Sequence, residues 1–186
     1  LQEGVYDPNI FKAFFLAGGP GSGKSYVVRR TTGGTGLKVV NSDDAFESLL
    51  KKAGLSLKMP PEEFERKEKV RAHAKELTAK RQANYLDGRL GLIIDGTGRQ
   101  SSKILRQKSS LEELGYDTYM IFVNTSIDVA LERNEKRARS LQSSFVIKSW
   151  KDVQSNIGAF NNMFRKGFIV VDNNDADEDV FQSVWK

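Results

Sequence analysis

Short apolar segments alternate with longer segments of helical character along most of the chain. Most of the short segments are almost continuously apolar, which is typical of strands covered on both faces. The pattern predicts strands at 11–17, 37–41, 89–95, 117–124 and 167–172. It predicts helices at 23–32, 43–53, 61–87, 101–114, 126–141 and 146–165.

The alternation of strand and helix predicts an α/β fold with right-handed crossovers and about five mostly parallel strands. We expect three layers, α/β/α, in a single domain over residues 1–186, because no linker, repeat or low-complexity segment interrupts the chain. The pattern leaves the strand order open. Pro61 is expected in the first turn of one helix, and Thr125 is expected to cap another. The C-terminal tail is expected to add a short helix with Phe181 and Trp185 on one face.

Composition narrows the chemistry. The chain has no cysteine and a single histidine, His73, so disulfides, thiolate nucleophiles and His- or Cys-based metal clusters are excluded. Lys and Arg number 29 and Asp and Glu 24, giving 29 − 24 = +5. This charge suits an anionic partner such as a nucleotide or nucleic acid, or it reflects a generic basic surface. Because no signal peptide or membrane-length apolar run is found, we expect a soluble, cytoplasmic protein that does not engage a membrane.

The segment GGPGSGKS, residues 18–25, matches the phosphate-binding loop pattern G-x-x-x-x-G-K-[ST]. A predicted buried strand precedes it and a predicted helix follows it, which is the context that a P-loop NTPase fold requires. The glycines allow successive backbone N–H groups to surround a phosphate, and Lys24 can bridge the β- and γ-phosphates. The Ser25 hydroxyl can bind Mg²⁺. The residues predicted to bind the nucleotide are Gly19, Gly21, Ser22, Gly23, Lys24 and Ser25.

Polar side chains also follow the next two predicted strands, and the carboxyl ends of parallel strands meet at one edge of a sheet. Asp43 and Asp44 follow the second strand. A carboxylate there can accept a proton from an acceptor hydroxyl or help to hold Mg²⁺; alternatively, Ser42 or Asp43 caps the helix.

Asp95, Thr97 and Arg99 follow the third predicted strand. Asp95 suits a metal or water ligand, or it forms the turn before Gly96. We expect Asp43, Asp95, Thr97 and Arg99 to contact substrate, and Ser25, Asp43 and Asp95 to hold the metal.

Arginines concentrate in LERNEKRARSL, residues 131–141. Arg133 and Arg137 are four residues apart on one face of the predicted helix, and Arg139 follows. A mobile arginine that reaches the transferred phosphoryl group stabilises the charge that develops on its oxygens. The alternative is a solvated basic face paired with Glu132 and Glu135.

Taken together, these motifs resemble P-loop kinases of the zeta-toxin-like group, which includes zeta toxins, polynucleotide kinases and related phage-encoded kinases. The matching segments cover roughly residues 11–140 in family order and include VVNSDDAF (39–46), LIIDGTGR (92–99) and ALERNEKRAR (130–139). The resemblance implies ATP- and Mg²⁺-dependent transfer of the γ-phosphate to a hydroxyl. It implies that Asp44 is the general base and that Arg133, Arg137 and Arg139 belong to a lid region, about 133–145, that closes over ATP. Asp95 stands where zeta toxins have Glu, which shortens the reach of the carboxylate.

The acceptors in this group differ: a UDP-amino-sugar for zeta toxins, a 5′-hydroxyl for polynucleotide kinases, and 5-hydroxymethyluracil in DNA for phage base-modification kinases. The compact, basic, phage-like chain favours the last acceptor, in an infected bacterial cytoplasm. Candidate DNA contacts are the basic stretches 99–108 and 146–151, where Trp150 either stacks on a base or belongs to the helix core. A target base in duplex would have to be flipped out. A nucleotide-dependent switch without an acceptor is the alternative outside the enzymes; the sequence leaves the oligomeric state open.

Overall fold

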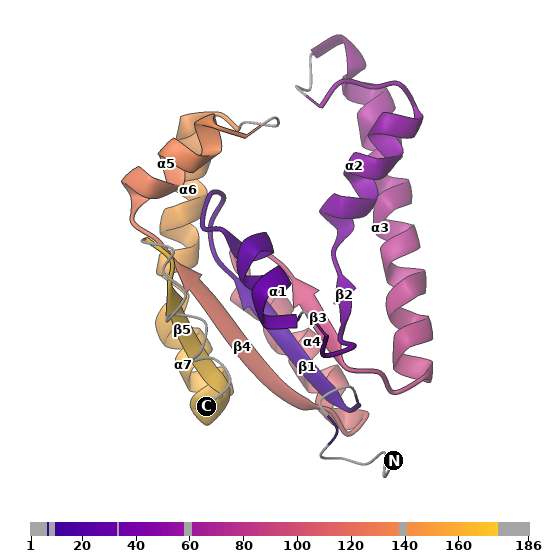
Figure 1. The fold of residues 1–186 in the computed structure, drawn as a ribbon, viewed down its shortest axis with the longest axis vertical. Helices are drawn as coiled ribbons and strands as arrows, with labels where there is room; N and C mark the ends of the chain where they lie inside the picture. The colour runs from indigo at the N-terminus through magenta and orange to yellow at the C-terminus, as the bar shows by residue number, and fades with distance from the viewer. Residues whose placement is uncertain (1–6, 8–9, 33, 58–60, 138–140, 175–186) are drawn as a thin grey trace.

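The computed structural model describes residues 7, 10–32, 34–57, 61–137 and 141–174 (Figure 1). Arg139 and the tail helix predicted around Phe181 and Trp185 lie outside these residues. The elements, in chain order, are β1 (Lys12–Ala17), α1 (Lys24–Thr32), β2 (Lys38–Val40), α2 (Ser42–Lys52), η1 (Pro61–Glu63), α3 (Phe64–Asp87), β3 (Leu92–Asp95), α4 (Ser101–Glu113), β4 (Asp117–Asn124), α5 (Ile127–Glu135), α6 (Ser143–Gln154), α7 (Ile157–Phe164), η2 (Arg165–Gly167) and β5 (Phe168–Asp172).

The sheet contains the five predicted strands, all parallel, in the order β2-β3-β1-β4-β5. The predicted α/β fold is therefore confirmed, and the structure adds the strand order. β1 lies in the middle, with Phe14 beside Ile93 of β3 and Tyr119 of β4. The helices that follow β1 and β3 cover opposite faces, so the carboxyl ends of β1 and β3 flank a topological switch point, where open α/β sheets bind ligands.

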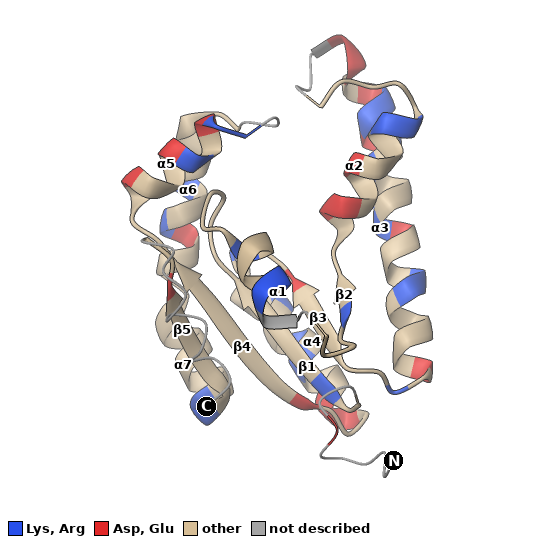
Figure 2. Cartoon of the chain, in the orientation of Figure 1, with Lys and Arg blue, Asp and Glu red and all other residues tan. Residues whose placement is uncertain are grey.

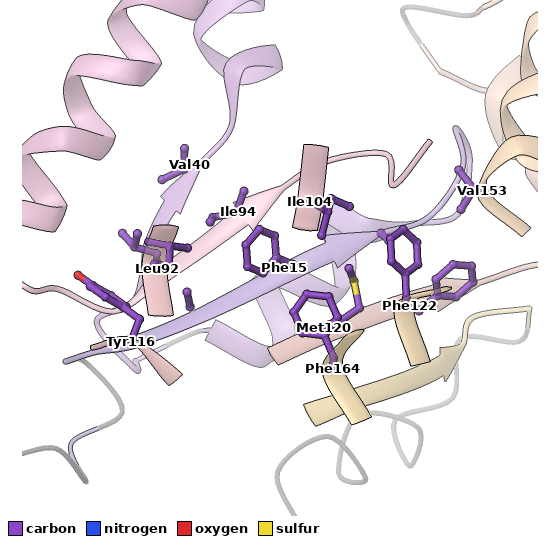
Figure 3. Close-up of a cluster of buried hydrophobic side chains, with 14 residues drawn as sticks. Phe15, Val40, Leu92, Ile94, Ile104, Tyr116, Met120, Phe122, Val153 and Phe164 are labelled. Carbon is purple, nitrogen blue, oxygen red and sulfur yellow. The ribbon is translucent and has the colours of Figure 1, made fainter. Parts of the chain in front are cut away.

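Neighbouring side chains on each strand enter two different cores. Phe15 faces the cluster formed with α4, α6 and α7, which includes Ile104, Phe122 and Phe164 (Figure 3). Leu16 faces the opposite side, where Val27 of α1 packs. Burial on both faces explains why the strands are continuously apolar in sequence, and it makes the three predicted layers.

Helices α2 and α3 form a separate pair beside β2 (Figure 1). They pack on each other through a small cluster that contains Phe46, Leu50 and Ala74, and the Arg71 guanidinium lies 4.3 Å from the centroid of the Phe46 ring. Only the C-terminal end of α3 reaches the main core, through Tyr85 and Leu86. The pair therefore lies at the β2 edge of the sheet (Figure 1). None of the helices in the described part of the chain is long and apolar enough to cross a membrane.

Two predicted helices differ from those in the structure. α5 ends at Glu135 rather than at 141, because the buried Asn134 side chain bonds to both backbone groups of Leu141, at 2.8 and 3.0 Å, and turns the chain back. Arg133 and Arg137 therefore do not share a helical face, and that prediction was wrong. The predicted helix 146–165 is divided into α6 and α7 at Ser155 and Asn156.

Two predicted N-caps were also wrong by one or two residues. Asn41, not Ser42 or Asp43, caps α2 by accepting from the Asp43 N–H at 2.8 Å. Ser126, not Thr125, caps α5 by accepting from the Val129 N–H at 3.3 Å. In each case the cap belongs to the residue that has extended backbone angles immediately before the helix.

Candidate active site

The P-loop connects β1 to α1 and is fixed by close packing. Gly21 and Gly23 have φ angles of 81° and 83°, and residues with a side chain rarely adopt this backbone conformation. A Cβ on Gly21 would lie 2.2 Å from the Ala130 carbonyl oxygen, and one on Gly23 would lie 2.2 Å from Nδ2 of Asn173. The backbone of α5 and the side chain of Asn173, the residue after β5, thus approach the loop as closely as glycine permits.

Asn173 and Arg133 support the loop from behind. Asn173 is only 3% exposed and donates Nδ2 to the Ser22 carbonyl at 2.8 Å. The Arg133 guanidinium donates to the carbonyls of Asn173 and Asn174 at 2.7 and 3.2 Å. In this structure Arg133 binds the backbone of Asn173 and Asn174, and Asn173 in turn binds the P-loop. The predicted contact between Arg133 and a phosphate stays a prediction.

Helix α6 braces three of the loops that meet at the carboxyl edge. The Trp150 indole donates to the Thr125 carbonyl at 2.8 Å, and a Cβ on Gly19 would touch the Trp150 backbone at 3.4 Å. Trp150 therefore packs against the P-loop; it is half-buried and belongs to none of the core clusters, and its stacking on a base stays a prediction. Asn156, in the break after α6, donates to the carbonyls of Gly98 and Arg99 at 2.9 and 3.0 Å.

Lys24 begins α1 and folds back over the loop. Its ammonium donates to the Gly18 carbonyl at 2.6 Å and to the Gly19 carbonyl at 3.4 Å. Burial lowers the pKa of Lys24; Arg137 lowers it further, whereas Asp95 and Asp43 act in the opposite direction. The next residue, Ser25, is exposed on the first turn of α1, so the predicted phosphate and metal groups lie side by side.

Asp95 ends β3, next to the strand that carries the P-loop. Its Oδ2 accepts a 2.9 Å hydrogen bond from Nδ2 of Asn41, the residue that also caps α2. Burial raises the pKa of the Asp95 carboxyl, Asp44 and Asp43 raise it further, and Lys24 lowers it. Asp95 therefore interacts electrostatically with the P-loop lysine and with the aspartates of α2, and its hydrogen bond from Asn41 ties it to the start of α2.

Asp43 and Asp44 occupy the exposed first turn of α2, where Figure 2 shows acidic residues. Partial burial raises the pKa of Asp44, and the nearby carboxylates of Glu47 and Asp43 raise it further. A carboxylate with a raised pKa is a stronger base than an ordinary aspartate. This property suits the role predicted for Asp44.

No three carboxylate or histidine side chains among the described residues gather closely enough to bind a metal by themselves. Mg²⁺ commonly takes one or two protein ligands and completes its shell with water and substrate phosphates. The assignment of Ser25, Asp43 and Asp95 as metal ligands stays a prediction, and such a ligand set would suit an ion that arrives with a nucleotide.

A cavity of about 850 Å³ opens beside Asp95. Its floor includes Val40, Ile94 and the predicted substrate residues Asp95, Thr97 and Arg99, and its walls come from α3, α4 and α6. The exposed Thr97 also accepts a backbone hydrogen bond from Gly18 at 3.1 Å, which ties the cavity to the P-loop. Asp95 thus lies between the phosphate loop and a volume large enough for an acceptor.

Arg99, which lines this cavity, is held by two neighbouring side chains. Its guanidinium donates to Oδ2 of Asp152 through Nε at 3.2 Å and Nη2 at 3.0 Å, and it lies 5.2 Å from the centroid of the exposed Phe145 ring. Arg137 is exposed, and its charge lowers the pKa of both Lys24 and Asp95; its contact with a phosphate stays a prediction. His73 lies on the surface of α3, as predicted.

The sequence analysis did not identify four residues that build the site: Asn41, Asp152, Asn156 and Asn173. Each acts through a contact with a residue at least 50 positions away, apart from the cap that Asn41 also forms. Asn41 alone had a local signal, because asparagine directly before a helix is a preferred N-cap.

Comparisons with known proteins agree with this architecture. A sequence profile of the family described as an AAA domain matches residues 14–159. No curated protein sequence matches the chain. A provisionally assigned kinase from Chloroflexus aurantiacus superposes with a TM-score of 0.60 at 17% identity, covering 95% of each chain. A gluconokinase from Sinorhizobium meliloti gives 0.56 at 15% identity, covering 95% of this chain and 90% of that one.

A chain of the Pnkp1/Rnl/Hen1 RNA repair complex gives a TM-score of 0.59 at 20% identity, and the match covers 82% of this chain and 47% of that one. Identities this low show the fold alone, which is a P-loop kinase-type fold.

Proposed function

The chain belongs to this AAA domain family, and on that premise we propose that it is an ATP-dependent kinase of a hydroxyl group carried by nucleic acid. The acceptor that we propose is the hydroxymethyl group of 5-hydroxymethyluracil in DNA. The observation that carries the proposal is the position of Asp95. It ends the strand beside β1, which leads into the P-loop; it accepts from Asn41, the cap of the helix that carries Asp44; and it lines the cavity. Donor and acceptor sides of a transfer reaction meet at that carboxylate.

The residues present fit ATP with Mg²⁺. The loop has no space for side chains at Gly21 and Gly23, and the buried Ser22 hydroxyl has no hydrogen-bond partner among the described residues. Lys24 would hold the phosphates and the exposed Ser25 hydroxyl would hold the metal. Bound ATP supplies the phosphoryl group, and Mg²⁺ neutralises its charge.

The chain's own residues then position the acceptor and move its proton. Asp44 accepts the proton of the acceptor hydroxyl at a carboxylate oxygen, and its raised pKa brings its basicity closer to neutral pH. Asn41 orients Asp95 and fixes the start of α2, which carries Asp44. Arg137 is exposed and its charge lowers the pKa of Lys24 and Asp95, so it is our candidate for the arginine that approaches the phosphates.

The choice of a nucleic-acid acceptor is supported by the charge around the cavity. Lys75, Arg99, Lys103 and Lys148 line it, against two carboxylates, Asp95 and Asp152. Figure 2 shows basic residues along α3. The likeness to a chain of an RNA repair complex agrees with this choice, whereas the gluconokinase likeness favours a small-molecule acceptor as the second candidate.

The test is a panel of acceptors with γ-labelled ATP: DNA containing 5-hydroxymethyluracil, DNA with 5′-hydroxyl ends, and UDP-N-acetylglucosamine. We expect label on the hydroxymethyluracil DNA, and none when Lys24→Met replaces the wild type. Label on the sugar nucleotide alone would establish the zeta-toxin-type activity instead. ATP hydrolysis without any labelled acceptor would indicate a nucleotide-dependent switch.

A further inference from the structure

Two helices, α3 and α4, line the cavity with the same spacing of residues. Helix α3 contributes Lys75, Thr78, Ala79 and Gln82, at i, i+3, i+4 and i+7, which is one helical face. Gln100 and helix α4 contribute the same pattern, Gln100, Lys103, Ile104 and Gln107. Helix α6 adds Lys148 and Asp152, one turn apart. Each wall of the cavity therefore presents a lysine.

These lysines differ from others on the same helices. Lys75, Lys103 and Lys148 are exposed and make no ion pair within the residues that the structure describes. By contrast, Lys80 of α3 pairs with Glu76 at 2.8 Å, and Lys108 of α4 pairs with Glu112 at 2.6 Å.

The acidic residues of the cavity do not neutralise the three lysines. Asp152 pairs with Arg99 at 3.0 Å, and Asp95 accepts from Asn41 and lies near Lys24. The positive charge that faces the cavity therefore comes from three ammonium groups on three helices. A neutral acceptor can only accept hydrogen bonds from these ammonium groups, whereas an acceptor with several separated anionic groups also gains a charge–charge attraction at each.

The size of the cavity limits the form of that acceptor. Its volume of about 850 Å³ lies in the range of small-ligand sites, roughly 300–1,000 Å³. Three side-chain amides, Gln82, Gln100 and Gln107, line it and can both donate to and accept from the edge of a base. The cavity suits an unpaired nucleotide with its flanking phosphates, and a double helix does not fit within it.

We infer that the cavity between α3, α4 and α6 binds an unpaired polynucleotide strand, whose phosphates are held by Lys75, Lys103 and Lys148. The inference rests on the proposed function and names the form of its substrate. It assigns the three lysines to substrate binding and not to the chemical step, so their loss weakens binding of the strand while leaving the ATP site unchanged.

The test measures the affinity for a fluorescein-labelled single strand carrying one 5-hydroxymethyluracil, without ATP, between about 50 and 200 mM salt. For single strands, each neutralised phosphate contributes roughly 0.7 to the slope of log K against log salt. Each of Lys75→Gln, Lys103→Gln and Lys148→Gln should therefore lower the slope by about 0.7, and the triple variant by about 2. Lys80→Gln on α3 is the matched control and should leave the slope unchanged.

The outcomes separate this inference from the proposed function. A wild-type slope in all three variants, with the strand still phosphorylated, would overturn the inference and leave the kinase proposal standing. A duplex of the same sequence bound as tightly as the strand would also overturn it. If the lysines set the slope but no nucleic acid accepts label from ATP, the strand site stands and the proposed reaction is wrong.

Discussion

Asn41 makes two contacts that can be separated by mutation. Its Oδ1 caps α2 through the Asp43 N–H, and its Nδ2 donates to Asp95 at 2.9 Å. Losing an N-cap costs about 1 kcal/mol, and losing a hydrogen bond to a charged group costs about 1.5–3 kcal/mol. Because Asp95 is half-buried, the lower end of the second range applies.

Asn41→Ser keeps a capping oxygen but is too short to reach Asp95, so its free energy of unfolding should fall by about 1.5 kcal/mol. The free energy of unfolding of Asn41→Ala should be about 2.5 kcal/mol below that of the wild type, since this variant loses both contacts. Asn41→Asp keeps the cap and brings a second carboxylate to Asp95. That repulsion exists when both groups are ionised and disappears on protonation, so the destabilisation should shrink as pH falls through the raised pKa of Asp95.

The assay is urea unfolding followed by far-UV circular dichroism, at neutral pH and near pH 4, with Asn84→Ser on the exposed surface of α3 as the matched control. The reasoning fails if Asn41→Ser is as stable as the wild type. It also fails if Asn41→Asp is equally destabilised at both pH values, because the Asp95 contact would then carry no electrostatic energy.

Three further predictions concern the loop and the base. Asn173→Ala should lower the free energy of unfolding by about 1–3 kcal/mol and weaken ATP binding, because the buried Ser22 carbonyl loses its donor; unchanged ATP affinity by calorimetry would contradict this. Gly21→Ala should abolish ATP binding, because its Cβ would lie 2.2 Å from the Ala130 carbonyl oxygen. The control is Gly54→Ala, where φ is also positive but the space is open, so only backbone strain should lower the melting temperature. Equal losses of ATP binding and melting temperature in the two variants would show that the clash at Gly21 has no effect. Glu47→Gln removes a carboxylate that raises the pKa of Asp44, so the acid limb of the pH profile of kcat/KM should move to lower pH; a fixed limb would mean that Asp44 is not the base.

The strands could be predicted from the sequence because each face of the sheet demands apolar residues. Phe15 and Leu16 are buried in different cores on opposite faces of the sheet. Because both faces are buried, consecutive residues of the strand are all apolar. The P-loop could also be predicted, because its glycines are required by positive φ angles and by the lack of space for a Cβ.

The contacts that join the loops could not be predicted in the same way. Asn41 was assigned to the end of a strand, and its bond to Asp95 depends on β2 lying beside β3, an order that periodicity leaves open. Residues 131–141 are rich in good helix formers, yet the paired bonds between Asn134 and Leu141 end the helix early. Tertiary hydrogen bonds here outweigh local propensity.

The central claim is that Lys24, Asp95 and Asp44 serve one reaction at one edge of the sheet. It is tested most directly by single-turnover transfer from labelled ATP in Asp44→Asn, with ATP affinity measured on the same preparation. We predict that transfer falls by on the order of 10²–10⁴ while ATP binds as in the wild type. Transfer at the wild-type rate would contradict the account, because the carboxylate after β2 would then have no part in the chemistry.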